Sequence, residues 1–328
     1  VEKPQLMCIG LFMAGGGISL IGFLHSYWAM FFAAMFTGIG VAIFHPEGSK
    51  LAAYVSGDNK GTAMSIFSVG GNVGFAVGPI VASLLMLGIG LKGTAAFVVI
   101  GTITTIIMTT QLKGLKEASL HHHETAKVKA AQGEAQKDNW SAFTKVSLSM
   151  LCRCIISSCM ITFLPLFWVS VLAQSVAQGN IQLTINSVAG AVATLLGGRL
   201  ADKYGFRRLA MICTIAAPPF FFAFAFNRSP VMGTFLVICI ALLMSGCQST
   251  FVVMGQSFLP NRIGFASGIM YGLTVSMGGM VAPGIGWIGD NYGLQTSVLT
   301  LAFISVAGLI FSVMIPRTPL DGPRLKRK

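Results

Sequence analysis

Charged side chains are scarce in this sequence of 328 residues, because Asp, Glu, Lys and Arg together make up only 10% of it. An average soluble domain contains about 25% charged residues. Apolar residues make up 54% of the chain, and its mean hydropathy is +0.76. This balance excludes an ordinary soluble protein and predicts a chain that lies largely within a lipid bilayer.

The alternation of apolar and polar residues that marks β-strands is also lacking, which excludes a transmembrane barrel. Apolar segments of about 20 residues, the length that crosses the hydrocarbon core as a helix, occur repeatedly instead. Ten such segments lie near 5–24, 28–55, 61–88, 92–112, 143–172, 179–200, 208–226, 230–257, 263–289 and 293–315. The sequence therefore predicts an all-α membrane protein with ten transmembrane helices.

Patterns of metal ligands are absent as well. All seven cysteines fall inside predicted spans with no paired His or acid, and we interpret them as small core residues. The triplet His121 to His123 lies in the one long polar stretch, where a solvated linker is favoured over metal binding. We expect no metal and no cofactor.

The net charge of +12 comes from basic residues that fall almost entirely in loops at one face of the predicted bundle. Only Lys92 and Arg228 fall at the opposite face. By the positive-inside rule the first face is cytoplasmic, which places both termini in the cytoplasm. Topology thus accounts for the basic residues, and nucleic acid is not expected as a partner.

The chain contains an internal repeat with an offset of about 203 residues. The segments NKGTAMSIF and RIGFASGIM align, pairing Gly61 with Gly264, Ala63 with Ala266 and Ile66 with Ile269. Each is followed by a glycine-rich helix with one proline, Pro79 or Pro283, and His45 falls opposite Gln248. This repetition predicts two related halves.

Four spans precede the polar stretch and six follow it. We therefore expect an N-terminal half at 1–112, a central cytoplasmic loop at 113–142 and a C-terminal half with a basic tail at 143–328. The first half is two helices short, and the chain begins at Val1 rather than at Met. These features predict a fragment of a protein with twelve helices, built as six plus six, with helices 3 to 12 present.

The most specific motif is the short loop GGRLADKYGFRR at 197–208. Gly205 permits a tight reversal of the chain, and Asp202 can neutralise the positive N-terminus of a neighbouring helix. The motif resembles the loop signature of the major facilitator superfamily through Gly198, Leu200, Ala201, Asp202, Lys203, Gly205, Arg207 and Arg208. The resemblance implies a six-plus-six transporter fold and a latch that favours one alternating-access state. A plain cytoplasmic turn is the alternative.

A second motif is a stripe of glycines, spaced four residues apart, on one face of the span at 61–88. Its members are Gly70, Gly74 and Gly78, and Pro79 follows directly. Such a face lets another helix approach closely, and Pro283 marks the corresponding helix of the second half. The stripe resembles the fifth-helix motif of major facilitator antiporters, which implies export. It departs from that motif at Ser65, Ala82 and Ser83, where the motif has glycine.

The segment FHPEGSKLAA at 44–53, followed by GTAMSIFSVGGNVG, resembles the fosmidomycin-resistance branch of this superfamily. The resemblance spans the whole chain and implies a monomeric exporter of a drug or small molecule, driven by proton entry across the bacterial inner membrane. It also implies that the spans at 28–55 and 143–172 line a central cavity.

His45, Glu47 and Arg153 are the candidates for function within those two spans. Glu47 is about 12 Å from the cytoplasmic end of its helix, and Pro46 is expected to break the helix locally. We predict that Glu47 or His45 exchanges the coupled proton, while Arg153 attracts an anionic group of the substrate or pairs with Glu47 when the site is empty. The alternatives are a Glu47–Lys50 pair in interfacial water, a histidine that caps the broken helix, and a structural arginine.

Gln248, Gln182 and Asn186 are further candidates for substrate binding, with interhelical hydrogen bonding as their more common use. We therefore predict a proton-coupled exporter of a small drug or metabolite, with an anionic substrate as one case, that needs no cofactor besides the proton gradient. An importer of a small organic anion or sugar is the second reading. A membrane-embedded enzyme or receptor is the third reading, although the sequence shows neither a nucleophile with a base nor a metal cluster.

Overall fold

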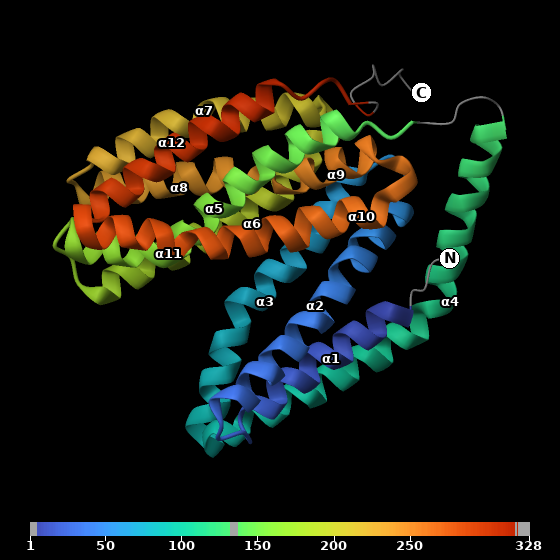
Figure 1. Ribbon diagram of the computed structural model, residues 1–328, viewed down its shortest axis with the longest axis horizontal. Helices are drawn as coiled ribbons and strands as arrows, with labels where there is room; N and C mark the ends of the chain where they lie inside the picture. The colour runs from blue at the N-terminus through green and yellow to red at the C-terminus, as the bar shows by residue number, and fades with distance from the viewer. Residues whose placement is uncertain (1–4, 132–136, 319, 321–328) are drawn as a thin grey trace. The chain divides into compact units, whose positions relative to one another are not determined.

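The computed structural model describes residues 5–131, 137–318 and 320 (Figure 1). Within these ranges the chain is helical and contains no β-strand. Eight helical segments in this part are long and apolar enough to cross a membrane, and the apolar helix Gln5–Ile21 is shorter. The prediction of an all-α membrane protein is confirmed.

The first of two compact units holds the described residues up to Gly57 and those that follow from Gly70 through α4. Its helices are α1 (Gln5–Ile21), α2 (Tyr27–Val55), most of α3 (Lys60–Ile89), η1 (Gly90–Ala95) and α4 (Ala96–Ala131). Glycines let α1 approach two neighbours closely: a Cβ at Gly10 would lie 2.6 Å from the Gly40 carbonyl oxygen, and one at Gly15 would lie 3.0 Å from the Gly101 Cα. Small residues of this kind are the usual means of packing helices in lipid.

The second unit comprises Asp58–Val69, which includes the first turns of α3, and the described residues from Lys137 onward. Its other helices are α5 (Trp140–Ser170), α6 (Val176–Tyr204), α7 (Phe206–Phe226), α8 (Pro230–Gly246), α9 (Gln248–Phe258), η2 (Pro260–Arg262), α10 (Ile263–Gly268), η3 (Ile269–Leu273), α11 (Thr274–Tyr292) and α12 (Leu294–Val313). The unit boundary falls inside α3, between Val69 and Gly70. The start of α3 is thus part of the second unit.

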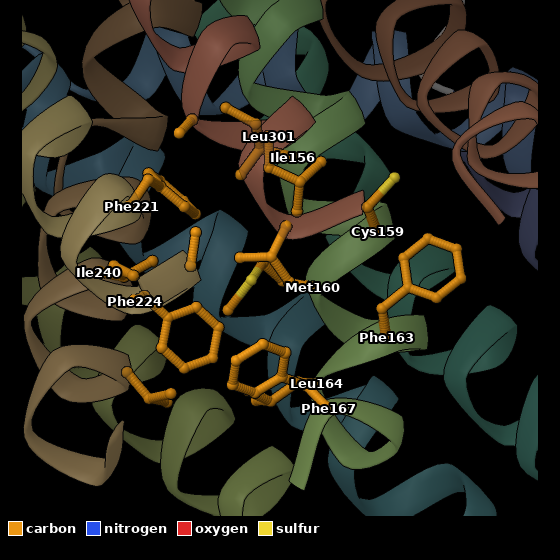
Figure 2. Packing of buried hydrophobic residues seen from close by; sticks show 14 of the residues in the cluster. Ile156, Cys159, Met160, Phe163, Leu164, Phe167, Phe221, Phe224, Ile240 and Leu301 are labelled. Carbon is orange, nitrogen blue, oxygen red and sulfur yellow. The ribbon is translucent and has the colours of Figure 1, made fainter. Parts of the chain in front are cut away.

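Aliphatic and aromatic side chains together fill the core of the second unit (Figure 2). Phe167 of α5 and Phe224 of α7 have ring centroids 4.7 Å apart, and Trp168 stacks on Phe224 at 6.1 Å. Each such pair contributes about 0.5–1.5 kcal/mol beyond the area that it buries. This packing holds α5 against α7 and fixes the helix that carries Arg153.

The span predicted at 230–257 is not one continuous helix, because α8 ends at Gly246 and α9 starts at Gln248, with Cys247 between them. A Cβ at Gly197 of α6 would overlap the backbone carbonyl of Gly246. The two backbones therefore touch where the helix is interrupted. Hydropathy does not change at this point, so the apolar run alone gave no sign of the break.

Replacing Gly197 with alanine is expected to destabilise the protein, because the new methyl group would collide with main-chain atoms that cannot rotate away. Overpacking of this kind typically costs about 1–3 kcal/mol. Thermal unfolding in detergent measures the effect. Gly279→Ala in α11 is the matched control, since no atom of the described residues lies within 4 Å of its added Cβ. Equal melting temperatures for the two variants would contradict the contact.

Two further expectations are corrected. α4 does not end at 112 but continues to Ala131, because Lys113, Lys116 and Glu117 suit an exposed helix as well as a loop. α2 runs through Pro46 without interruption, so the local break expected there is wrong. A helix tolerates the single missing N–H, and Nδ1 of His45 lies 3.2 Å from the Val41 carbonyl oxygen one turn earlier.

Candidate functional site

Asp202, near the end of α6, caps the start of α3. Its Oδ1 accepts a hydrogen bond from the Gly61 N–H at 2.9 Å, and its Oδ2 accepts from the Thr62 N–H at 2.7 Å and the Thr62 hydroxyl at 2.6 Å. The first N–H groups of a helix lack partners within the helix and carry the positive end of its dipole. The Asp202 carboxylate, which is 5% exposed, thus binds the free N–H groups at the positive end of α3.

The other residues of the loop signature position this contact. Gly205 has φ of +99°, a value that favours glycine, and this turn joins α6 to α7. A Cβ at Gly198 would collide with the Gly61 carbonyl oxygen and the Ser65 hydroxyl, so only glycine permits this approach of α6 to α3. Arg207 donates from Nε to the Ile315 carbonyl at 2.7 Å, whereas Lys203 and Arg208 are exposed.

Arg153 lies buried in α5 with 5% of its surface exposed. Its Nη1 donates to the carbonyl oxygen of Met244, in the last turn of α8. Its Nη2 donates to Oε1 of Gln248, the first residue of α9, at 2.6 Å. One guanidinium group therefore joins both sides of the break at Cys247, and its Nε is buried without a hydrogen-bond partner among the described residues.

The structure brings together Arg153 and Gln248, two residues that the sequence predicts to bind substrate. Gln182 and Asn186 lie one turn apart on α6; Gln182 is buried and Asn186 is half-buried. Oε1 of Gln182 has no hydrogen-bond partner within the described part of the chain, and the hydrogen bonds of Arg153 go to Met244 and Gln248 instead. The substrate-binding roles of Gln182 and Asn186 therefore stay predictions that rest on helix position.

Glu47 and His45 lie in α2 of the first unit. Oε1 of Glu47 accepts from Nζ of Lys50 at 2.8 Å, and the two side chains are 17% and 10% exposed. This is the Glu47–Lys50 pair foreseen as an alternative, although it is largely buried rather than at a wet interface. Oε2 of Glu47 is buried and has no hydrogen-bond partner in the described residues.

The glycine stripe has no close neighbour in the part of the chain that the structure describes. A Cβ at Gly70, Gly74 or Gly78 would meet no described atom within 4 Å. The Pro79 side chain lies outside the described residues, and Pro283 is exposed on α11. Close helix packing at this stripe stays a prediction.

Comparison with known proteins agrees with this architecture. A sequence model described as Major Facilitator Superfamily matches residues 2–283 and 146–328. The chain belongs to the Major Facilitator Superfamily. It is therefore a multi-pass membrane protein of a transporter family, as its motifs predicted.

Two relatives within the superfamily match nearly the whole chain. The uncharacterized MFS-type transporter YfnC of Bacillus subtilis (strain 168) is 28% identical over 311 residues, covering 94% of this chain and 76% of that protein. The fosmidomycin resistance protein of Escherichia coli (strain K12) is 27% identical over 318 residues, covering 95% of this chain and 77% of that protein.

Solved structures of the Major Facilitator Superfamily show the same fold. FucP, the fucose:proton symporter of E. coli, matches in its outward conformation with a TM-score of 0.72 and 13% identity, over 96% of this chain and 83% of FucP. The human organic anion transporter MFSD10 (TETRAN) matches with a TM-score of 0.73 and 14% identity, over 94% of this chain and 76% of MFSD10. At these identities the likeness concerns the fold alone.

Sequence reasoning missed several contacts of this superfamily member. It did not identify the Met244 carbonyl as a partner of Arg153, nor Gly61 and Thr62 as the groups that Asp202 caps. It also missed the hydrogen bond between Ser68 and Tyr271. Only the last had a signal in the sequence, since these two residues are separated by 203 positions, the period of the repeat.

Proposed function

We propose that this protein is a secondary active exporter of a small anionic drug or metabolite, coupled to proton entry and working by alternating access. The observation that carries the proposal is Arg153, a cation 5% exposed within a membrane span. Charges in such positions are rare and usually serve a substrate or ion pathway. A guanidinium group can bind a phosphonate or carboxylate through two parallel hydrogen bonds.

The present partners of Arg153 suit an empty site. They are an uncharged carbonyl and an uncharged amide, so an anion would compete with them through its charge. Gln248 lies within reach of the same ligand. The similarity to a fosmidomycin resistance protein supports an anionic substrate, since fosmidomycin is a phosphonate.

Glu47 is the proposed site of the coupled proton. Its buried and unpartnered Oε2 is the atom that would carry the proton, while Lys50 occupies Oε1. His45, two residues earlier, is the second candidate because histidine titrates in the useful range of pH. The proton and the substrate would be bound in alternating states of the same cycle.

Asp202 would act as the latch between those states. Three hydrogen bonds to the start of α3 must break if that helix moves away from α6. The distribution of basic residues supports placing this latch and both termini on the cytoplasmic side of a bacterial inner membrane. Accumulation in whole cells separates the proposal from import: an exporter lowers the internal substrate concentration, and an importer raises it.

Glu47→Gln is expected to abolish proton-driven transport while leaving substrate binding intact, because the amide keeps the shape but cannot exchange a proton. Reconstituted vesicles with an imposed pH gradient measure the transport, and equilibrium binding of the substrate measures the rest. Glu117→Gln is the matched control, since Glu117 is exposed on α4. Unchanged gradient-driven transport in Glu47→Gln would remove this residue from the mechanism.

A further inference from the structure

A small cavity lies inside the second unit, between α5, α7, α8 and α12. Its volume is about 20 Å³, which is room for one particle of the size of a water molecule. All four helices belong to segments that are long and apolar enough to cross a membrane. Among the described residues that line the cavity, only Arg153 is charged.

The charge of Arg153 has no acidic partner in the described part of the chain. Nη1 and Nη2 donate to the carbonyl of Met244 and the amide oxygen of Gln248, and both of these groups are uncharged. A buried cation without a counter-charge is costly, because it has lost its hydration and gained no opposite charge in return. Nε, which is buried without a hydrogen-bond partner among the described residues, is the guanidinium nitrogen that remains for a ligand.

Three hydroxyl groups line the same cavity, one each from α5, α7 and α12. Ser149 donates to a carbonyl of α12 at 3.0 Å, whereas Thr214 and Ser305 each donate to a carbonyl of their own helix, at 2.8 Å and 2.6 Å. A hydroxyl rotates to suit its partner, so these groups can turn to donate to a ligand in the cavity instead. Hydrogen bonds to an ionised acceptor are about twice as strong as those between neutral groups.

We propose that this cavity binds a single halide ion, held by Nε of Arg153 and the hydroxyls of Thr214 and Ser305. Water would fit the volume but would leave the charge of Arg153 unbalanced, whereas a halide fits both the volume and the charge. A carboxylate or a phosphonate has several heavy atoms and is too large. Because Nη1 and Nη2 point to the break between α8 and α9, the halide site goes beyond the proposed function and does not depend on transport of any substrate.

Thermal unfolding of the purified protein in detergent tests halide binding without a substrate. Sodium bromide is compared with sodium gluconate at equal ionic strength, since gluconate is too large for the cavity. We expect the melting temperature to rise with bromide concentration, because the ion binds the folded state. Thr214→Val keeps the shape of the side chain but removes one donor. It should weaken the apparent affinity for bromide roughly tenfold or more, as loss of a hydrogen bond to a charged group does.

Two further variants make this test specific. Thr300→Val is the matched control, because Thr300 also donates to its own helix but does not line the cavity, and it should bind bromide as the wild type does. Gly308→Ala keeps Arg153 and all three hydroxyls but reduces the room. Its added Cβ would lie 3.2 Å from the Cys152 Cβ, and both residues line the cavity. We expect this variant to lose the response to bromide.

Anomalous diffraction from crystals grown in bromide locates the ion directly, and we expect a peak in the cavity within hydrogen-bonding distance of Nε. Equal melting temperatures in bromide and gluconate, or crystals without this peak, would overturn the proposal and leave the cavity to water. A full response to bromide in Gly308→Ala would also overturn it, and this variant decides alone if Thr214→Val does not fold. Bromide binding by a protein that transports no phosphonate would keep the halide site and reject the proposed substrate class.

Discussion

Arg153→Ala is expected to abolish transport of an anionic substrate. The variant removes the buried charge that α5 carries, and with it the paired hydrogen bonds proposed to hold the substrate. Loss of a buried charged partner typically weakens binding by about 2–5 kcal/mol, which is roughly 30-fold or more in affinity. Binding of a phosphonate to the purified protein, followed by transport in vesicles, measures both consequences.

Arg153→Lys refines this prediction. Lysine keeps the positive charge but loses the planar fork, so it cannot donate to Met244 and Gln248 together with its former geometry. We expect residual binding, intermediate between the wild type and Arg153→Ala. A rank order in which lysine is no better than alanine would show that the fork matters more than the charge.

The matched control is Arg228→Ala. Arg228 also donates to a glutamine, with Nη2 lying 2.7 Å from Oε1 of Gln295, but this pair is exposed. Exposed pairs of this kind contribute little to stability, and we expect normal binding and transport. Full anion transport by Arg153→Ala, with the control also normal, would reduce Arg153 to a structural clamp on the break between α8 and α9.

Asp202→Asn is expected to slow transport strongly while leaving substrate affinity nearly unchanged. The amide has the same shape but removes the charge that the start of α3 requires. Hydrogen bonds to charged groups contribute about 1.5–3 kcal/mol, so the balance between latched and open states should shift roughly 10- to 150-fold. Turnover suffers because a cycle needs both states to be populated.

Two variants test the origin of this effect. Thr62→Val removes one of the three bonds to Asp202 and should cause a smaller defect in the same direction. Asp290→Asn, at an exposed position on α11, should have no effect. Transport rates in vesicles at saturating substrate give the comparison. Wild-type turnover in Asp202→Asn would leave this motif as a plain turn between helices.

The membrane fold was accessible to prediction because hydrophobic runs and basic loops report directly on the bilayer. The loop signature was equally readable, since Asp202 has a charge that needs a partner and Gly205 has a φ that glycine favours. The helix break at Cys247 could not be predicted from the sequence. It depends on the contact between the Gly197 and Gly246 backbones and on Arg153, which come from three different helices.

Prediction from local sequence was also wrong in two places. Pro46 suggested a broken helix, yet the neighbouring turns of α2 hold the helical geometry. The polar stretch after residue 112 suggested a loop, yet leaving the membrane does not end a helix, and α4 continues to Ala131. Partner identity was the hardest to foresee, because the groups that Asp202 binds lie some 140 positions away along the chain.

Fosmidomycin susceptibility of a pump-deficient bacterium tests the central claim most directly. The complete protein is expressed beside Arg153→Ala and Glu47→Gln at matched levels, and growth is scored against drug concentration. We predict protection by the wild type that disappears in both variants. Protection that persists in Arg153→Ala, or no protection by a well-expressed wild type, would contradict export of this anion through the site at Arg153.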